Sequence, residues 1–381
     1  MFLEIHLLQN FALSNLNRDD TGAPKTCIFG GTRRARISSQ CLKRAIRTHF
    51  REEGLVPSEL LSYRTRLLHR ELTGRLVAAG LADEAAKQTA GKALELLQFK
   101  LKNGKTEYLL VLGEREISRL TELCKAHAES ILASGGGKSS KKDEEGRLAQ
   151  VLLDAIDGGE ALDIALFGRM IATHAEKSVD AAVQMAHAFS THSVAAEFDF
   201  YSAVDDLQKQ DDVEGAGAGM LGTTLYNSSC YYRYANLDLN QLAKNLNGET
   251  SHVETAARAF LVGAIHAVPT GKRTNSAPQN PPAFIMAVVR DKGLWSLANA
   301  FIKPIFSGPK ADLIQLSAGQ LLRHWNQLAS LYGMETIRYA GVATYLSAGD
   351  LEVAEAAGVT QETKVSALVD RVMEAIRVVQ N

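Results

Sequence analysis

A segment near the beginning of this chain carries charge of only one sign. Between Asp20 and Glu52 there are eight basic residues and no acidic one. The whole chain is nearly balanced, with 42 basic and 43 acidic residues, so the excess is local. Because repulsion among so many like charges must be offset by a partner, we expect the fold to present this segment to a polyanion, with nucleic acid as the leading candidate. The basic residues are Lys25, Arg33, Arg34, Arg36, Lys43, Arg44, Arg47 and Arg51.

Bulk properties are those of an ordinary globular protein. The 381 residues can form two or three domains, or one core with large insertions. The N-terminus is too short and too charged for a signal peptide, and no apolar run approaches the length of a membrane span, so we expect a cytoplasmic protein with no membrane partner. The four cysteines form no CxxC pair, which predicts reduced thiols without a zinc site or a disulfide framework. They are Cys27, Cys41, Cys124 and Cys230.

The hydrophobic pattern predicts an α+β protein with a helical insertion and a protruding ribbon. Strands are expected at residues 2–8, 161–170, 183–191, 284–289 and 337–345. Helices are expected at 38–50, 251–268, 311–332 and 363–379, and throughout 54–161 except for a surface loop at 134–147. Residues 9–36 are expected to form an ordered loop with a turn at Gly30 and Gly31. The ribbon has predicted arms at 196–204 and 229–239 and an acidic, glycine-rich tip at 211–219.

The basic segment is predicted to form a helix with one cationic face. Lys43, Arg47 and Arg51 follow one another at intervals of four residues, with Arg44 beside them. The hydroxyl of Ser38 and the free N–H groups of the first turn suit phosphate oxygens, and the two glycines upstream would let the backbone approach a ligand. The alternative is a solvated helix face whose arginines pair with acids elsewhere. The opposite side, expected to be buried, holds Leu42, Ala45, Ile46, His49 and Phe50.

Aromatic residues of the ribbon allow two interpretations. Phe198 and Phe200 share one strand face, and Cys230, Tyr232 and Tyr234 share another. If these rings are exposed, they can stack on bases; if they are buried, they are ordinary core.

Enzyme motifs fail on inspection. The run SGGGKSS lacks the first glycine of a phosphate-binding loop, since position 132 is Leu132. The sequence has no HExxH, GxSxG or paired-cysteine motif, and His187 and His192 are interpreted as core or surface residues and not as metal ligands. We therefore expect no enzyme activity, no cofactor and no metal.

Paired carboxylates leave one catalytic alternative open. The pairs Asp19–Asp20 and Asp205–Asp206 could bind Mg²⁺ for RNA cleavage. Adjacent residues in a strand point to opposite sides, however, so salt bridges to nearby arginines are the preferred interpretation.

Several motifs resemble one known family. The run LNRDD, nine residues, then GGTRRARISSQCLKRAIR is similar to the CasC-type backbone subunit of the type I-E CRISPR Cascade complex, a member of the RAMP superfamily. Later stretches agree in the same order: LDIALFGRM, AHAFSTH, FYSAVDDLQ, YYRYANLDL, VPTGKRT and SLANAF. The resemblance covers most of the chain and is weakest over residues 51–157.

The resemblance implies a ferredoxin-like palm of the RNA-recognition type, with a helical fingers insertion and a β-hairpin thumb. The palm would use residues 1–50, 160–192 and 229–381, the fingers 51–159 and the thumb 193–228. It also implies a non-catalytic scaffold that polymerises along CRISPR RNA with further copies of itself and other Cascade subunits. The bound RNA would keep its bases exposed for pairing with target DNA in antiviral defence.

The same resemblance implies which residues bind RNA. The backbone would be held by Arg18, Lys25, Ser38, Gln40, Lys43 and Arg47, with Arg44 on the same helix and Lys272 and Arg273 in a later loop. Met170 and Ser202 would lie near a kink of the RNA. Related type III backbone subunits cut RNA with an aspartate after the first strand, which keeps Asp19 or Asp20 as an RNase alternative. A third hypothesis makes the basic face a docking site for an acidic protein.

Overall fold

The computed structural model describes residues 1–134, 139–158, 160–203, 220–308, 311–347 and 357–377, and its chain divides into two units. The first contains Met1–His49, Gln184–Leu237 and Phe260–Asn381; the second contains Phe50–Val183 and Asp238–Ala259. Both helices and strands are plentiful, so the expected α+β class is confirmed. The finer division into palm, fingers and thumb remains a prediction.

Most strands of the described residues join one sheet of ten, in the order β14-β13-β12-β1-β11-β9-β3-β2, with β8 and β10 also paired to β11. The pair β13–β14 is parallel, whereas β12 runs antiparallel to both of its neighbours. The strands are β1 (Phe2–Ser14), β2 (Thr26–Phe29), β3 (Thr32–Ile37), β8 (Val183–Met185), β9 (Ala188–Ser190), β10 (Glu197–Ala203), β11 (Met220–Asp238), β12 (Phe284–Arg290), β13 (Ile337–Thr344) and β14 (Thr360–Glu362).

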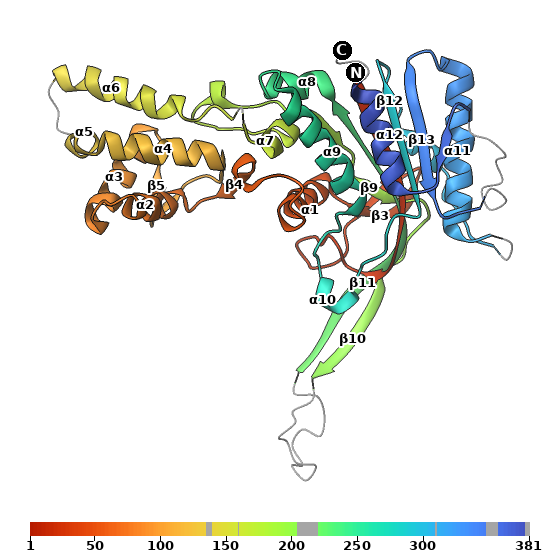
Figure 1. The fold of residues 1–381 in the computed structure, drawn as a ribbon. Helices are drawn as coiled ribbons and strands as arrows, with labels where there is room; N and C mark the ends of the chain where they lie inside the picture. The colour runs from red at the N-terminus through yellow and green to blue at the C-terminus, as the bar shows by residue number, and fades with distance from the viewer. Residues whose placement is uncertain (135–138, 159, 204–219, 309–310, 348–356, 378–381) are drawn as a thin grey trace, which may run out of the picture. The chain divides into compact units, whose positions relative to one another are not determined.

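Helices cover both faces of this sheet (Figure 1). Leu8 of β1 packs in one core cluster with Phe301 of the short helix η3 (Leu297–Phe301) and Trp325 of α11 (Leu313–Tyr332). Leu7 points to the opposite face, because neighbours along a strand alternate. That face is covered by α1 (Ser39–Glu52), α9 (Thr250–His266) and α12 (Val365–Arg377). The central strand β12 is buried at every position, which explains its nearly continuous apolar sequence.

The strand predicted at 161–170 is wrong. This segment forms α7 (Leu162–Phe167), which ends at Gly168 with a φ of 79°. Five consecutive residues of α7 are buried, so no polar stripe marks a helical period, and a short apolar run of this kind also resembles a strand. The buried Asp163 carboxylate accepts hydrogen bonds from the backbone N–H and the hydroxyl of Ser62, which fixes the helix start.

The loop predicted at 9–36 is also wrong in part. Strand β1 continues to Ser14, and β2 and β3 form a hairpin whose turn is Gly30 and Gly31. Both glycines have positive φ, 59° and 73°, as a tight hairpin turn requires. The turn itself is therefore confirmed, whereas its flanks are strands.

The ribbon pairs differently from the prediction. Strand β10 pairs with residues 220–226 of β11, and the predicted second arm, 229–239, is instead part of the main sheet. The predicted strand 183–191 is divided into β8 and β9, and the predicted loop 134–147 contains the start of α6 (Ser139–Asp154). The predicted tip at 211–219 lies outside the described residues. The region 54–161, predicted to be helical apart from that loop, also contains short strands at residues 62–65, 101–102, 105–106 and 110–113, so this prediction is wrong in part. The remaining predicted strands and helices are confirmed, with ends that differ by a few residues.

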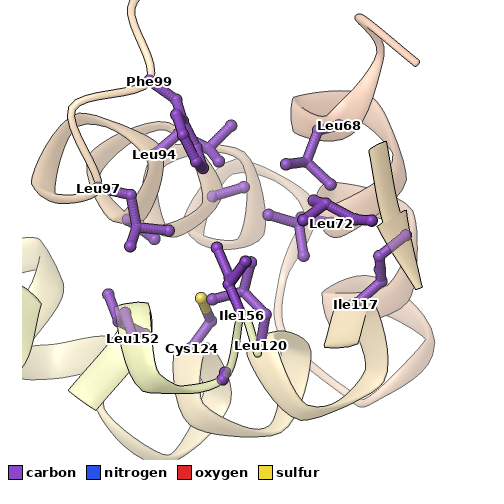
Figure 2. Packing of buried hydrophobic residues seen from close by; sticks show 14 of the residues in the cluster. Leu68, Leu72, Leu94, Leu97, Phe99, Ile117, Leu120, Cys124, Leu152 and Ile156 are labelled. Carbon is purple, nitrogen blue, oxygen red and sulfur yellow. The ribbon is translucent and has the colours of Figure 1, made fainter. Parts of the chain in front are cut away.

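The second unit is mostly helical and has its own apolar core (Figure 2). Leu72, Leu94, Leu120 and Ile156 are among its fully buried side chains and come from helices and a following turn far apart in sequence. Its elements are β4 (Ser62–Thr65), α2 (Leu68–Ala78), α3 (Asp83–Leu96), β5 (Leu101–Lys102), β6 (Lys105–Thr106), β7 (Leu110–Gly113), α4 (Glu114–Ala126), α5 (Ala128–Ala133), α6, α7 and α8 (Leu239–Asn245), with short 3₁₀ turns η1 (Ser58–Leu60) and η2 (Ala175–Lys177).

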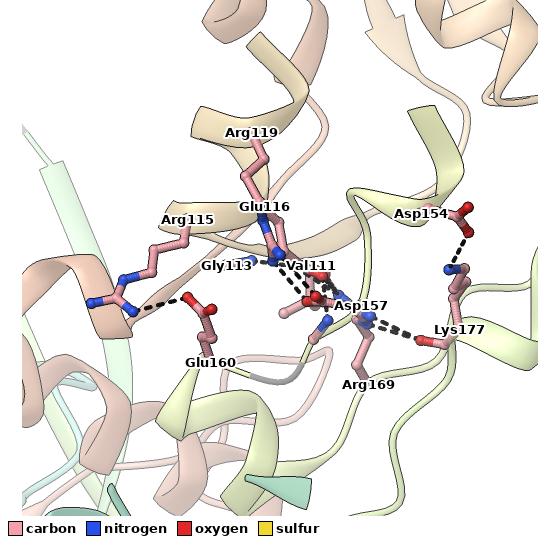
Figure 3. Close-up of polar contacts among 11 residues, drawn as sticks. Val111, Gly113, Arg115, Glu116, Arg119, Asp154, Asp157, Glu160, Arg169 and Lys177 are labelled. Carbon is pink, nitrogen blue, oxygen red and sulfur yellow. Dashed lines mark hydrogen bonds and ion pairs between the residues drawn. The ribbon is translucent and has the colours of Figure 1, made fainter. Parts of the chain in front are cut away.

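A buried ion pair lies beside this core (Figure 3). Nη1 of Arg169 lies 2.8 Å from both carboxylate oxygens of Glu116. The carboxylate also accepts hydrogen bonds from the backbone N–H groups of Gly113 and Gly158, and Arg169 donates to the carbonyl oxygen of Lys177. Both partners are thus satisfied, which a buried pair needs because burial removes the hydration of both charges.

We expect Glu116→Gln to destabilise the second unit by about 3–5 kcal/mol, because it leaves the Arg169 charge buried and unpaired. Far-UV circular dichroism during urea unfolding measures the loss. Fluorescence of Trp295 and Trp325, both in the first unit, reports that unit separately. The control is Glu160→Gln, which removes an exposed pair with Arg115 and is expected to cost less than about 1 kcal/mol. Equal losses for the two variants would contradict the prediction.

Candidate nucleic-acid interface

The loop after β1 is joined to the start of the basic helix. The side-chain oxygen of Asn17 accepts a hydrogen bond from the backbone N–H of Ser38 at 2.8 Å, and its carbonyl accepts from the N–H of Lys25 at 2.9 Å. Ser38 is buried, and its hydroxyl oxygen accepts a hydrogen bond from the N–H of Cys41, as an N-cap does. These contacts bring Lys25 and the exposed Arg18 close to the first turn of α1.

The outward face of α1 is only partly as predicted. Gln40 and Arg44 are exposed, but Lys43 and Arg47 are half-buried, and burial lowers the pKa of Lys43. The next cation, Arg51, donates to the carbonyl of Ser62 and lies over the ring of Tyr63. The cationic stripe is therefore less exposed than its spacing indicated. On the inward side Leu42, Ile46 and Phe50 are buried as predicted, whereas Ala45 and His49 are half-buried.

Arg34 has a structural role that its place in the basic run concealed. Its side chain is 0% exposed, and its guanidinium donates to the carbonyl oxygens of Ser190, Thr191 and Phe301 at 2.9–3.0 Å. Since every one of these acceptors belongs to the chain itself, Arg34 holds β3, the end of β9 and η3 together and is not free to meet a ligand.

Gly30 also serves the fold. A Cβ atom on this residue would lie 1.8 Å from the carbonyl oxygen of Ile302, so only glycine allows the hairpin to approach that segment. The expectation that Gly30 lets the backbone approach a ligand is corrected: the close neighbour is the chain's own backbone.

A second basic loop lies against the first one. Gly271 packs so closely on the segment before Arg18 that a Cβ atom would lie 2.3 Å from the carbonyl oxygen of Leu16. The next two residues are Lys272, which is half-buried with a φ of 50°, and the exposed Arg273. The structure thus brings Lys272 and Arg273 near the loop that carries Arg18, although about 250 residues of sequence separate them.

Electrostatic effects identify further residues close to the cationic patch, by which we mean Arg18, Lys25, Arg44, Lys272 and Arg273. Burial raises the pKa of the Cys41 thiol, and the positive charges of Arg44 and Lys25 oppose the rise. Burial, together with the charges of Arg36 and Lys25, lowers the pKa of His187, whose Nδ1 lies 3.3 Å from a guanidinium nitrogen of Arg36. Arg36 and His187 therefore lie next to the predicted site. Neither residue was included in the site prediction. Membership of Arg36 in the basic run was the only sequence signal.

The ribbon supplies exposed aromatic rings next to this patch. Phe198 and Phe200 of β10 are 77% and 68% exposed, and Ser202 is also exposed, whereas Tyr232 on β11 is buried in the core. The side-chain amide of Asn15 donates to the carbonyl of Leu225 at the base of the ribbon and to that of Gly22 in the loop. The two interpretations of the ribbon therefore each hold for different rings: the phenylalanines are exposed, and the tyrosine is core.

Met170 belongs to the second unit. It lies outside the helix α7 and is 79% exposed, so it is not a core residue.

The carboxylate of Asp19 closes a turn. Its Oδ1 accepts hydrogen bonds from the N–H and the hydroxyl of Thr21 and from the N–H of Ala23, and these bonds lower its pKa. It therefore caps its own loop, whereas a salt bridge had been expected. Within the described ranges no group of three or more His, Cys, Asp or Glu residues is arranged to hold a metal ion. The second predicted pair, residues 205 and 206, lies outside those ranges.

His192 is also engaged within the chain. Its Nδ1 lies 2.7 Å from the carbonyl of Ser193, and its Nε2 accepts from the N–H of Cys230, so the ring is a neutral structural group. Burial lowers its pKa, in agreement with this role. In the part of the chain that the structure describes, no helix has the length and apolar character needed to cross a membrane.

Comparisons with known proteins agree with one another. Residues 3–371 match the profile of the family described as CT1975-like protein. A solved chain titled "CRISPR RNA-guided surveillance complex, pre-nicking" is 29% identical with a TM-score of 0.85, and the match covers 98% of this chain and 100% of that one. Another, titled "CRISPR RNA-guided surveillance complex", is 26% identical with a TM-score of 0.74 and the same coverage. No curated protein matches the sequence.

We expect Arg34→Lys to lower the free energy of unfolding of the first unit by about 2–4 kcal/mol, because the three carbonyl groups are bound by two separate nitrogens of a planar guanidinium and a single ammonium nitrogen does not reproduce that spacing. Tryptophan fluorescence in urea measures this loss. At temperatures where the variant remains folded, its affinity for single-stranded RNA should equal that of the unaltered protein. A weaker affinity with unchanged stability would show that Arg34 contacts the ligand.

Proposed function

Because the chain belongs to the CT1975-like protein family and is similar over its length to chains of CRISPR RNA-guided surveillance complexes, we propose that it is a non-catalytic scaffold subunit that binds CRISPR RNA in such a complex. In this proposal the cytoplasmic assembly is of the type I-E Cascade kind. The chain is its CasC-type backbone subunit of the RAMP superfamily, beside further copies of itself and other subunits. The comparisons support a CRISPR-associated role for this chain. Its role in RNA binding is our inference.

One observation carries the proposal: residues from separate parts of the sequence form a single cationic patch. Arg18, Lys25 and Arg44 lie around the start of α1, and the loop with Lys272 and Arg273 packs against the same segment. Cations of this kind hold phosphate groups without reading bases. A protein that must accept RNA of many sequences needs this kind of contact, and it leaves the bases free to pair with target DNA.

Sheet order supports the proposed palm. The elements β1, α1, β9, β11, α9 and β12 follow one another in the chain as a β-α-β-β-α-β unit with insertions, and their strands adjoin in the order β12-β1-β11-β9. This is the arrangement of a ferredoxin-like domain. We assign residues 51–159 of the helical second unit to the fingers and the β10–β11 ribbon to the thumb.

The exposed ribbon supports contact with another molecule. Besides Phe198 and Phe200, it exposes Leu221 on the same face and Met220 on the opposite one, and exposed apolar side chains gathered in this way mark an interaction site. We propose that this thumb reaches RNA held by a neighbouring copy, where its rings stack on bases. Ser202 on the thumb and Met170 in the palm range 160–192 are the residues assigned to the kink of the RNA.

We expect the double variant Arg18→Ala, Arg44→Ala to weaken binding of single-stranded RNA equally for unrelated sequences. About six phosphate contacts give a log–log dependence on salt concentration with a slope of about −4, and loss of two contacts changes it to about −3. Fluorescence anisotropy with several labelled RNAs over a range of salt concentrations measures both quantities.

The matched control is Lys292→Ala, Arg323→Ala, which removes the same charge from exposed positions elsewhere in the first unit. It should leave the slope unchanged. A loss confined to certain RNA sequences would refute a grip on the backbone. Binding of an acidic protein in place of RNA would support the docking hypothesis.

We expect no cleavage when the purified protein is incubated with labelled RNA and Mg²⁺. The three hydrogen bonds that the Asp19 carboxylate accepts all end on Oδ1 and hold it within its own turn, and in the described part of the chain no group of three or more His, Cys, Asp or Glu residues is arranged to hold a metal ion. Gel electrophoresis of the RNA provides the measurement. Magnesium-dependent products that disappear in Asp19→Asn or Asp20→Asn would establish the RNase alternative.

A further inference from the structure

A small hairpin of the second unit places like charges opposite each other. Strands β5 and β6 are joined by Asn103 and Gly104, both with positive φ, and Lys102 pairs directly with Lys105 across the hairpin. Lys100 precedes β5, and all three lysines are exposed. None of them forms an ion pair with a carboxylate of the described residues. Like charges at directly opposed positions destabilise a hairpin, so this arrangement is explained if an anion binds there.

A groove of about 440 Å³ lies beside the hairpin and is lined mainly by apolar and aromatic groups. Tyr108 is 58% exposed, and Leu109 and Met170 are exposed as well. Large apolar side chains that lie close together are normally buried against one another, yet these three remain open to solvent. Lys100 and Glu107 also line the groove. The Glu107 carboxylate would repel a phosphate, so the groove suits the uncharged base of a nucleotide and the lysines suit its phosphates.

Hydrogen bonds hold both walls of the groove in place. Thr106 of the hairpin donates its N–H to the carbonyl of Arg66, and Arg66 Nε donates back to the carbonyl of Thr106 at 2.8 Å. The wall that follows Met170 is fixed by His174, whose Nε2 lies 2.8 Å from the carbonyl of Leu97 and whose ring packs edge-on against Phe99 at 5.7 Å. The site is therefore formed before any ligand binds, which limits the entropy lost on binding.

We propose that this hairpin and groove form a second nucleic-acid site, which binds single-stranded DNA. Lys100, Lys102 and Lys105 contact its phosphates, and a base enters the groove to stack on Tyr108. A duplex is excluded because its bases are already stacked. The choice of DNA over RNA rests on the proposed function: RNA would occupy the first-unit patch, and its pairing with one target strand leaves the other DNA strand unpaired.

The decisive variant is Lys105→Glu, because it separates binding from folding. It replaces a repulsive cross-strand pair by an attractive one, so the melting temperature should not fall. Affinity for labelled oligo(dT), measured by anisotropy with the first patch saturated by unlabelled non-complementary RNA, should fall at least about fivefold, with a salt slope less negative by about 0.7. Lys87→Glu, the same charge change at an exposed position of α3, should alter neither value.

The stacking part is tested by Tyr108→Ala, which should weaken oligo(dT) binding about tenfold, whereas Tyr108→Phe keeps the ring and should bind as the unaltered protein does. Unchanged DNA affinity in Lys105→Glu, or an equal loss in Lys87→Glu, would overturn the proposal. So would an equal loss of DNA affinity in the Arg18→Ala, Arg44→Ala variant, since the DNA would then occupy the RNA patch. If the first patch binds no RNA, it cannot be saturated before the DNA titration. The oligo(dT) titration is therefore also carried out without RNA, so that it tests the proposal in either case.

Discussion

The buried guanidinium of Arg34 determines where the rest of the basic segment lies. It joins β3 to the end of β9 and to η3 through three carbonyl groups, in a position closed to solvent. Strand β3 leads directly into Ser38 and α1, so fixing β3 also fixes the start of the helix. Asn17 then attaches the preceding loop to that start. Without its three carbonyl partners, the charge of Arg34 would remain unsatisfied inside the sheet layer, and the first unit that carries these cations would be less stable.

Both units use the same physical device. In the first, Glu4 and Arg290 form a buried pair at 3.0 Å, and the carboxylate also accepts hydrogen bonds from Tyr234 and from the backbone of Trp295. Arg169 and Glu116 do the same in the second unit. Each buried charge in these pairs lies next to a charge of opposite sign. At the two proposed nucleic-acid sites, by contrast, the cations that lie close together have the same sign and repel one another. Stability is thus supplied by the interior, which allows repulsive charges to remain on the surface.

Cations of one sequence segment consequently have different roles. Arg34 is structural, Arg51 contacts the backbone of Ser62 and the ring of Tyr63, and Arg44 faces outward. The Lys102–Lys105 pair is a weaker sequence signal because two lysines three residues apart are common; only strand pairing shows that they oppose each other. Charge counting finds segments that meet a polyanion, but it does not tell which members of a segment are available to do so.

The amino-acid sequence by itself determined the α+β class, the central strands and the long helices, because each of these has a periodic or continuous apolar pattern that reflects its burial. It also located the basic segment, since the charge of each side chain follows from its residue type. Tertiary structure decided the rest. Helix α7 resembled a strand because it is buried along most of its length, and the second arm of the ribbon depended on the register of β11. The close approach of Gly271 to Leu16, the burial of Arg34 and the exposure of Phe198 all depend on contacts between residues far apart in the chain. Local sequence contains no record of such contacts, because they form only when the packed sheet brings those segments together.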